Sequence, residues 1–270
     1  MSMRPKTADP TVVSDLQRPL WNRSAEGYAD VFDGCVTKAI EPTLDAAGVV
    51  DGSRLLDVAT GPGIIAAAAL ERGATAKGID FAENMIAVAR KRYPGVEFDV
   101  ADATDLQFDD GTFDAVVMGF ALFMMAQPDK ALHEAHRVLA PGGRVACTVW
   151  DWPVPGFDLF YSPMERFVPE EPVLGGDPPL FGVSDGKVLK AVLTGAGFVD
   201  PAVESLPIVW ELASPDELFD ALATLRDFSE VPDDALNSFR SEVATGAQQY
   251  KRDGSYFLPF PALLLTGTKP

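Results

Sequence analysis

Three acidic residues and a glycine-containing turn have the types and spacing of a nucleotide-binding site. Asp57 lies in the run LLDVATGPGIIAAAAL, four residues before Gly61. Asp80 follows Gly61 by 19 residues, and Asp102 follows a third apolar run. A glycine turn that opens a helix lets the backbone approach a ligand at the helix N-terminus. Tight turns also need glycine for steric reasons alone, so the turn by itself does not identify a ligand.

The positions of the carboxylates indicate what kind of ligand would fit. Asp80 can accept both hydroxyls of a ribose, which suits NAD as well as other nucleosides. Asp102 can accept from the exocyclic amine of adenine. Asp57 would repel a pyrophosphate, whereas it suits a positively charged group or holds the turn through backbone amides. Together, the three carboxylates and the glycine turn favour a nucleoside with a cationic appendage as the ligand. An NAD-dependent oxidoreductase remains an alternative class of protein.

The elements that must position these residues alternate between apolar strands and helices. After a helical region over 20–48, we predict strands at 54–59, 76–80, 96–100, 113–118 and 144–150, with helices at 64–72, 82–93 and 128–139. Alternating strands and helices predict a parallel sheet with helices on both faces. The strands read as continuous apolar runs because both faces are covered.

The second half of the chain predicts a cap. Seven of the 22 prolines fall between Pro153 and Pro179, too many for a regular βα unit. We predict a helix at 184–196, a strand at 203–210, two helices within 214–250 and a last strand at 262–268. The predicted organisation is a loose tail at 1–19, a core with N-terminal lid helices at 20–150, cap and acceptor-binding insertions at 151–183 and 211–255, and the rest of the core sheet at 184–210 and 256–270.

Composition excludes several classes of function. The formal net charge is −18, so phosphate backbones and anionic membranes would be repelled, and neither nucleic acid nor a membrane is an expected partner. No apolar run reaches the length of a membrane span, and the first residues contain no signal core. We therefore expect a cytoplasmic protein. Cys35 and Cys147 suit a reducing compartment, and no metal site is expected. The oligomeric state is open, a homodimer included.

Four motifs resemble those of the class I S-adenosylmethionine (SAM)-dependent methyltransferases, closest to their broad small-molecule group. They are LLDVATGPG, GIDFAENMIAVAR, DVADATDLQFDDGTFDAVV and KALHEAHRVLAPGGRV, in this order within roughly residues 20–150. The resemblance implies an α/β fold: a doubly wound, Rossmann-like, mostly parallel sheet with an antiparallel last strand and a cap over the cofactor and acceptor cleft. It also implies SAM as the cofactor.

The resemblance further implies roles around the methionine part of the cofactor. Asp57 is expected to order the glycine loop and to lie near the amino group. Gly119 and Phe120, just past the fourth strand, are expected to border the sulfonium. The loop beside the methionine portion is expected to comprise Ala59, Gly61 and Gly63. Ala59 departs from the family pattern, which has a glycine there.

The nucleoside part is expected to bind further along the same sheet edge. Asp80 is implied to bind the ribose hydroxyls, and Phe81 and Met85 to flank the adenine. Asp102 and Ala103 are implied to contact the adenine edge. An N-terminal lid contributes an aromatic residue, for which Tyr28 is the best match, and Arg23 is either a carboxylate clamp or a surface charge.

The acceptor side has no evident base. Many relatives carry histidine near Phe123 and Met124, whereas the segment 120–125 here is wholly apolar and is either a pocket for a hydrophobic acceptor or core packing. The two histidines, His133 and His136, fall on a flanking helix. Methyl transfer can rely on positioning, with Tyr28 as the catalytic candidate. We expect in-line methyl transfer to O, N or C of a small hydrophobic acceptor; a non-methylating use of SAM, such as cyclisation or isomerisation, is the alternative.

Overall fold

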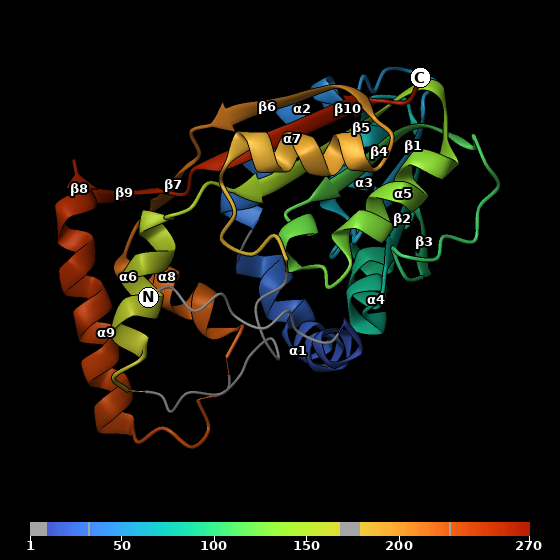
Figure 1. The fold of residues 1–270 in the computed structure, drawn as a ribbon. Coiled ribbons are helices and arrows are strands. Elements are labelled where there is room, and N and C mark those ends of the chain that lie inside the picture. The colour runs from blue at the N-terminus through green and yellow to red at the C-terminus, as the bar shows by residue number, and fades with distance from the viewer. Residues whose placement is uncertain (1–9, 32, 168–178, 227) are drawn as a thin grey trace.

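The computed structural model describes residues 10–31, 33–167, 179–226 and 228–270 (Figure 1). A seven-stranded sheet forms the centre, in the order β3-β2-β1-β4-β5-β10-β6, and a three-stranded sheet, β7-β9-β8, lies beside it. The large sheet consists of β1 (Arg54–Val58), β2 (Thr75–Asp80), β3 (Glu97–Val100), β4 (Phe113–Gly119), β5 (Leu139–Trp150), β6 (Val199–Leu206) and β10 (Ala262–Thr268). The small sheet consists of β7 (Val209–Leu212), β8 (Lys251–Arg252) and β9 (Ser255–Pro259).

The parallel register of the large sheet explains why the acidic residues converge. In the pairing of β1 with β2, Asp57 lies opposite Gly78, so β2 runs on to Asp80 just beyond the end of β1. Asp80 in turn pairs with Val100 of β3, and Asp102 lies two residues past that strand's end. Strands β1 to β4 therefore end at one edge of the sheet, which is where ligands bind in open α/β folds.

The prediction of an antiparallel last strand is confirmed. β10 lies between β5 and β6 and runs antiparallel to both, with Leu264 opposite Thr148 on one side and Glu204 on the other. The predicted doubly wound fold is confirmed as well. The strand predicted over 203–210 differs, because the chain there leaves β6 of the large sheet and enters β7 of the small one.

Helices cover both faces of the large sheet. On one face lie α5 (Pro128–Val138) and α7 (Gly186–Gly195), in front of the sheet in Figure 1. The other face carries α2 (Asp33–Ala46), α3 (Ile64–Glu71) and α4 (Glu83–Arg92). Along β4, Val116 and Met118 belong to the first core cluster, whereas Ala115 and Val117 belong to the second. This alternation puts successive side chains into two separate cores, as a doubly covered strand requires.

The prediction of a loose tail over 1–19 is wrong for its second half. Helix α1 spans Pro10–Val31, and residues 1–9 lie outside the described part of the chain. Gln17, Leu20 and Ser24 are buried at helical spacing, with Ala25 on the same side. Packing of this side stabilises the helix in spite of Pro19, whose missing N–H and ring disfavour helical interiors.

The cap is more regular than predicted. Helices α6 (Pro155–Met164), α8 (Pro215–Ala223) and α9 (Asp233–Ala247) pack beside the small sheet (Figure 1). Pro155 occupies the first turn of α6, where its missing N–H costs no helical hydrogen bond, whereas Pro163 lies near the end of the helix and removes one. The cap's aromatic core joins Phe160, Phe219 and Phe239 at centroid distances of 4.9–5.4 Å. Segment 168–178 of the predicted cap lies outside the described residues. Strand β9, predicted as core sheet, pairs with β7 of the cap.

Candidate functional site

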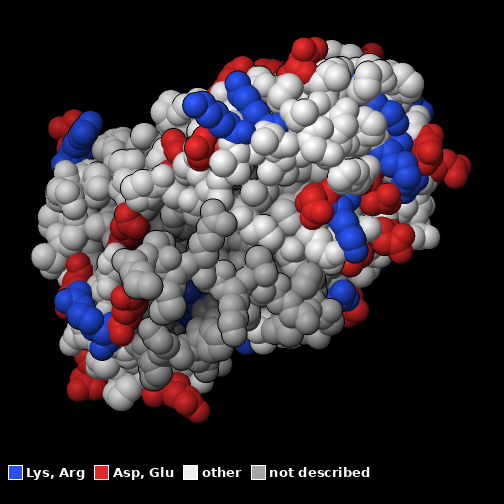
Figure 2. Space-filling model, in the orientation of Figure 1, with Lys and Arg blue, Asp and Glu red and all other residues white. Residues whose placement is uncertain are grey.

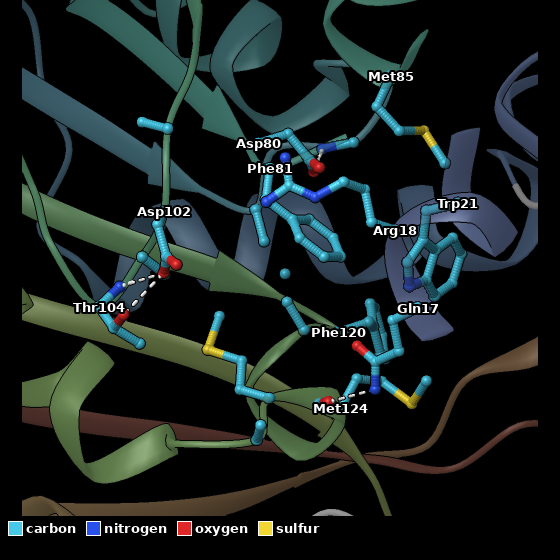
Figure 3. A pocket seen from close by; sticks show the side chains of 18 of the residues that line it. Gln17, Arg18, Trp21, Asp80, Phe81, Met85, Asp102, Thr104, Phe120 and Met124 are labelled. Carbon is cyan, nitrogen blue, oxygen red and sulfur yellow. Dashed lines mark hydrogen bonds between the residues drawn. The ribbon is translucent and has the colours of Figure 1, made fainter. Parts of the chain in front are cut away.

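A cleft follows the carboxyl edge of the sheet between α1 and the turns after β1 to β4. It comprises two adjoining pockets that share Tyr28, Ala59, Gly61, Gly119 and Phe120. We call the part beside β2 and β3 the outer pocket and the part beneath α2 and α3 the inner pocket. Figure 3 looks into the outer pocket, where side chains of α1 lie opposite Asp80 and Phe81.

Asp80 ties two turns of the outer pocket together. Its Oδ2 accepts a hydrogen bond from the backbone N of Gly61 at 2.9 Å, and its Oδ1 accepts from that of Ala82 at 2.9 Å. The carboxyl is buried, and this desolvation raises the pKa of Asp80 to about 6. Each carboxylate oxygen has a second lone pair, so the group still has capacity to accept from ligand hydroxyls.

Asp57 lies in the inner pocket with one oxygen unpaired. Its Oδ2 accepts from the hydroxyl of Thr60 at 2.6 Å and from the backbone N of Ala66 at 3.2 Å. Among the described residues, Oδ1 has no hydrogen-bond partner although it is fully buried. Burial is the main reason why the pKa of Asp57 is raised to about 7, and the nearby Asp80 charge adds to it. An unpaired buried carboxylate oxygen is an acceptor that suits a cationic donor.

The three residues of the predicted loop behave differently. Ala59 has φ +56°, a left-handed conformation that favours glycine, and it lines both pockets. Gly61 has φ +54°, and a Cβ there would project into open space. Gly63 lines neither pocket; a Cβ there would lie 2.6 Å from the ring of Phe98, so this glycine allows the start of α3 to pack on β3.

The predicted adenine contacts all line the outer pocket. They are Phe81, Met85, Asp102 and Ala103. Met85 is buried, whereas Asp102 is exposed at the mouth. Asp102 Oδ1 accepts from both the backbone N and the hydroxyl of Thr104 at 2.8 Å each, which fixes the carboxylate at the pocket wall (Figure 3).

The turn after β4 is held in an unusual conformation. Phe120 has φ +53°, and its backbone N donates to the carbonyl and the hydroxyl of Thr148, both at 3.0 Å. Its ring stacks on Trp150 at a centroid distance of 4.2 Å. A Cβ at Gly119 would lie 2.3 Å from the Cδ1 end of the Ile65 side chain, so a larger residue would require that side chain to move. Residues held in such conformations by their surroundings cluster at ligand sites.

Helix α1 roofs the outer pocket with residues that the sequence analysis partly missed. Tyr28 and Trp21 line it as an edge-to-face pair at 5.5 Å. Gln17 and Arg18, assigned to the tail, also line it: Gln17 Nε2 donates to the carbonyl of Met124 at 2.8 Å, and the guanidinium of Arg18 lies 5.4 Å above the ring of Phe81 (Figure 3). Residues 17, 21 and 28 recur at helical spacing, a signal that extends the helix N-terminally.

The structure does not bring Arg23 to the cleft. Arg23 is exposed and lines neither pocket. It follows Trp21 by two positions on α1 and therefore points away from the roof side.

The apolar segment 120–125 is divided between the core and the wall of the outer pocket. Leu122 and Phe123, in the 3₁₀ turn η1 (Leu122–Met124), are buried in the core. Phe120, Met124 and Met125 line the outer pocket. Among the described residues, none of the cap lines either pocket, including the aromatic residues at 151–167 and 179–183.

The histidines lie away from the cleft. His133 is exposed on α5, with Nδ1 2.7 Å from the carbonyl of Asp129. His136 is half-buried rather than on the surface, and its ring packs against Phe198 at 5.1 Å. Within the described ranges, no three His, Cys, Asp or Glu side chains are grouped as a metal would require.

Surface charge and hydropathy add two observations. On the face shown in Figure 2, acidic side chains occur in several groups, many with Lys or Arg beside them. Ion pairs of the described chain include Arg54 with Asp114 and Arg137 with Glu134 and Asp110. In the described part of the chain, no helix has both the length and the apolar character needed to cross a membrane.

The fold and the cleft define an α/β protein that binds a nucleoside-like ligand at its strand ends, and comparisons identify the family. Residues 56–147 match the family described as "Methyltransferase domain". The "Ubiquinone/menaquinone biosynthesis C-methyltransferase UbiE" of Desulfotalea psychrophila is 36% identical over 172 residues, covering 57% of this chain and 69% of that protein. The chain belongs to the class I SAM-dependent methyltransferases, and SAM rather than NAD is the family's cofactor.

Two further proteins define the extent of the similarity. The demethylmenaquinone methyltransferase of Clavibacter sepedonicus is 46% identical over 142 residues, covering 50% of this chain and 55% of that one. The chain thus spans about half the length of curated relatives matched at this level. The crystal structure of the [4+2]-cyclase SpnF superposes with a TM-score of 0.56 at 22% identity, covering 86% of this chain and 80% of that one. At this identity it shows a shared fold.

Proposed function

We propose that the protein transfers the methyl group of SAM to a small, hydrophobic, aromatic acceptor such as a hydroquinone. The observation that carries this proposal is the pair of buried carboxyls at one sheet edge. Asp80 lies beside the outer pocket, and Asp57, whose Oδ1 has no hydrogen-bond partner among the described residues, lies in the inner pocket. The relatives named as quinone-pathway methyltransferases support the acceptor class. The apolar side chains of Phe120, Met124 and Met125 on the wall of the outer pocket support it independently.

The residues present fit the cofactor. Asp80 would accept the ribose hydroxyls, and Asp102 and Ala103 would contact the adenine edge between Phe81 and Met85. The unpaired Oδ1 of Asp57 would accept from the amino group of the methionine part. The open space at Gly61 leaves room for the ligand to approach the backbone. When bound, SAM supplies an electrophilic methyl group on a sulfonium.

The chain's own contribution to catalysis is positioning. Phe120 and Gly119 line both pockets, and Thr148 holds Phe120 there by accepting two hydrogen bonds from its backbone N. Tyr28 of α1 also lines both pockets. Holding the acceptor atom in line with the transferred methyl supplies about 7–11 kcal/mol in favourable cases. Tyr28 is our candidate for the group that orients or deprotonates the acceptor hydroxyl, because the described cleft contains no histidine.

An activity assay tests the proposal. Purified protein is incubated with SAM and a panel of phenols and hydroquinones, and S-adenosylhomocysteine (SAH) and methylated product are both quantified. We expect equal amounts of the two. Product formed with SAM left intact would instead favour a non-methylating reaction. Tyr28→Phe is expected to lower kcat by about tenfold or more with SAH affinity unchanged; an unchanged kcat would remove Tyr28 from catalysis.

We also infer that the protein works in the cytoplasm, without nucleic acid or a membrane as its partner. The net charge of −18 supports this inference. Fractionation of cells that express the chain tests it, since a membrane-bound pool resistant to salt washing would contradict it.

A further inference from the structure

Arg226 differs from the other half-buried arginines of the described chain. Arg72, Arg137 and Arg240 each pair with carboxylates, and Arg92 donates to the carbonyl of Ala29. Arg226 is half-buried just after α8, and among the described residues its buried Nε has no hydrogen-bond partner. In a chain with 40 acidic residues, a guanidinium that has no carboxylate partner among the described residues is unexpected. Buried donors normally have a hydrogen-bond acceptor, so the Nε of Arg226 points to an acceptor supplied by a ligand.

The surroundings of Arg226 are aromatic. Its guanidinium carbon lies 5.4 Å from the centroid of the Tyr161 ring on α6. Tyr161 contacts Phe157 at 6.0 Å, and Phe157 stacks with Trp152 at 5.7 Å. The Nε1 of Trp152 is the second buried nitrogen of the described cap that has no partner. A guanidinium and an indole N–H, both donors, thus flank a wall of rings.

Contacts between aromatic rings connect this wall with the cofactor cleft. Phe157 contacts Trp150 at 5.1 Å, and Trp150 stacks on Phe120, which lines both pockets. A second connection runs through the roof helix. A Cβ placed on Gly27 of α1 would lie 2.9 Å from Thr224, two residues before Arg226, and Gly27 is next to Tyr28. Arg226 therefore follows, by two residues, a contact between the cap and α1, the helix that roofs the outer pocket.

We infer that Arg226, with Tyr161, binds an anionic oxygen of the acceptor while the acceptor's apolar body packs on the ring wall. The inference rests on the proposed function and narrows its substrate to aromatic molecules that carry a carboxylate or an ionised phenol. A guanidinium provides several N–H donors in a planar fork, which suits either group. Burial raises the pKa of Tyr161, so at neutral pH its hydroxyl is protonated and can donate to the same anion.

Calorimetry on SAH-saturated protein at pH 8 tests the inference with two matched pairs of probes. 4-Nitrobenzoate is compared with 4-nitrobenzamide, and 4-nitrophenolate with 4-nitroanisole. We expect at least one anion to bind ten times or more tightly than its neutral counterpart. Arg226→Gln should remove that preference, and Arg226→Lys should keep part of it. The pair that shows the preference distinguishes a carboxylate from a phenolate.

Arg240→Gln is the matched control. Arg240 also lies on the cap above an aromatic ring, Phe219 at 4.2 Å, but Asp216 and Asp220 pair with it, so its loss should leave the preference unchanged. The inference is overturned if neither anion is preferred, or if the preference survives in Arg226→Gln. SAH affinity is measured for every variant. Wild-type protein that fails to bind SAH contradicts the proposed function, whereas SAH binding without anion preference contradicts this inference alone.

Discussion

Asp80 and Gly61, 19 residues apart in the sequence, are joined by a 2.9 Å hydrogen bond from the backbone N of Gly61 to Asp80 Oδ2. The carboxylate that we assign to the ribose therefore also holds the glycine turn. Asp80→Ala should weaken SAH binding by about 1.5–3 kcal/mol, the range for a charged hydrogen-bond partner. Isothermal calorimetry checks this. Asp105→Asn, which changes an exposed acid outside both pockets, should leave the affinity unchanged. Equal affinity of Asp80→Ala and wild type would remove Asp80 from the site.

The left-handed conformation of Ala59 predicts a stabilising substitution. Ala59→Gly relieves a strain of about 1–2 kcal/mol, offset in part by the greater freedom of glycine in the unfolded chain. We expect a net gain of about 0.5–1 kcal/mol in the free energy of unfolding, measured by urea titration of the free protein. Ala87→Gly, at an exposed position inside α4, should have the opposite sign and cost about 1 kcal/mol. A loss of stability in Ala59→Gly would show that the methyl group packs favourably.

The raised pKa values of Asp57 and Asp80 predict a pH dependence with a defined sign. Both carboxyls bind protons more tightly in the folded than in the unfolded chain, with folded pKa values of about 7 and about 6. Their contribution to stability is therefore present at low pH and decreases as pH rises from about 4, the unfolded pKa, through 6 to 7. Asp57→Asn removes one of these titrations, so its stability relative to wild type should increase across that range. A difference between the two proteins that does not change with pH would contradict the assignment.

The same titration should appear in ligand binding. A cationic amino group beside Asp57 favours the ionised carboxylate, so SAH should bind more tightly as pH rises from 5.5 to 7.5. The affinity should rise by up to about tenfold per pH unit for each proton that binding releases. Calorimetry in two buffers of different ionisation enthalpy measures the protons released. Asp57→Asn should release fewer protons than wild type. Proton uptake on binding would exclude this role for Asp57.

Arg18 and Arg23 provide a paired test of the roof helix. Arg18 lies over Phe81 in the outer pocket, whereas Arg23 is exposed and outside it. Arg18→Ala should weaken SAH binding about two- to fivefold, as expected for an exposed cation–π contact of about 0.5–1 kcal/mol. Arg23→Ala removes the same charge from the same helix and should change nothing. The reverse order of effects would restore the clamp role that the sequence suggests for Arg23.

Local patterns in the sequence predict the fold and most of the cleft. Apolar runs and glycine stops locate β1 to β4 to within a residue or two, and register at a parallel sheet edge brings Asp57 and Asp80 together. The antiparallel placement of β10 follows from the family resemblance instead. Gln17 and Arg18 are missed because Pro19 interrupts the helical pattern, and only the packing of the buried side of α1 overrides it.

Other features depend on contacts between distant segments. The close packing of Gly63 against the ring of Phe98 depends on where β3 places that ring. That Arg226 Nε has no hydrogen-bond partner in the described part of the chain depends on which side chains the cap helices bring near it. Neither relationship has a periodic signal in the sequence.

The contact between Gly27 and Thr224 makes α1 a shared element. The same helix closes over the nucleoside and abuts the end of α8, from which Arg226 extends. If the cofactor orders α1 when it binds, the acceptor site beside Arg226 becomes more ordered as well, and the reverse also holds. The two occupants would then strengthen each other's binding by the same factor, whichever enters first.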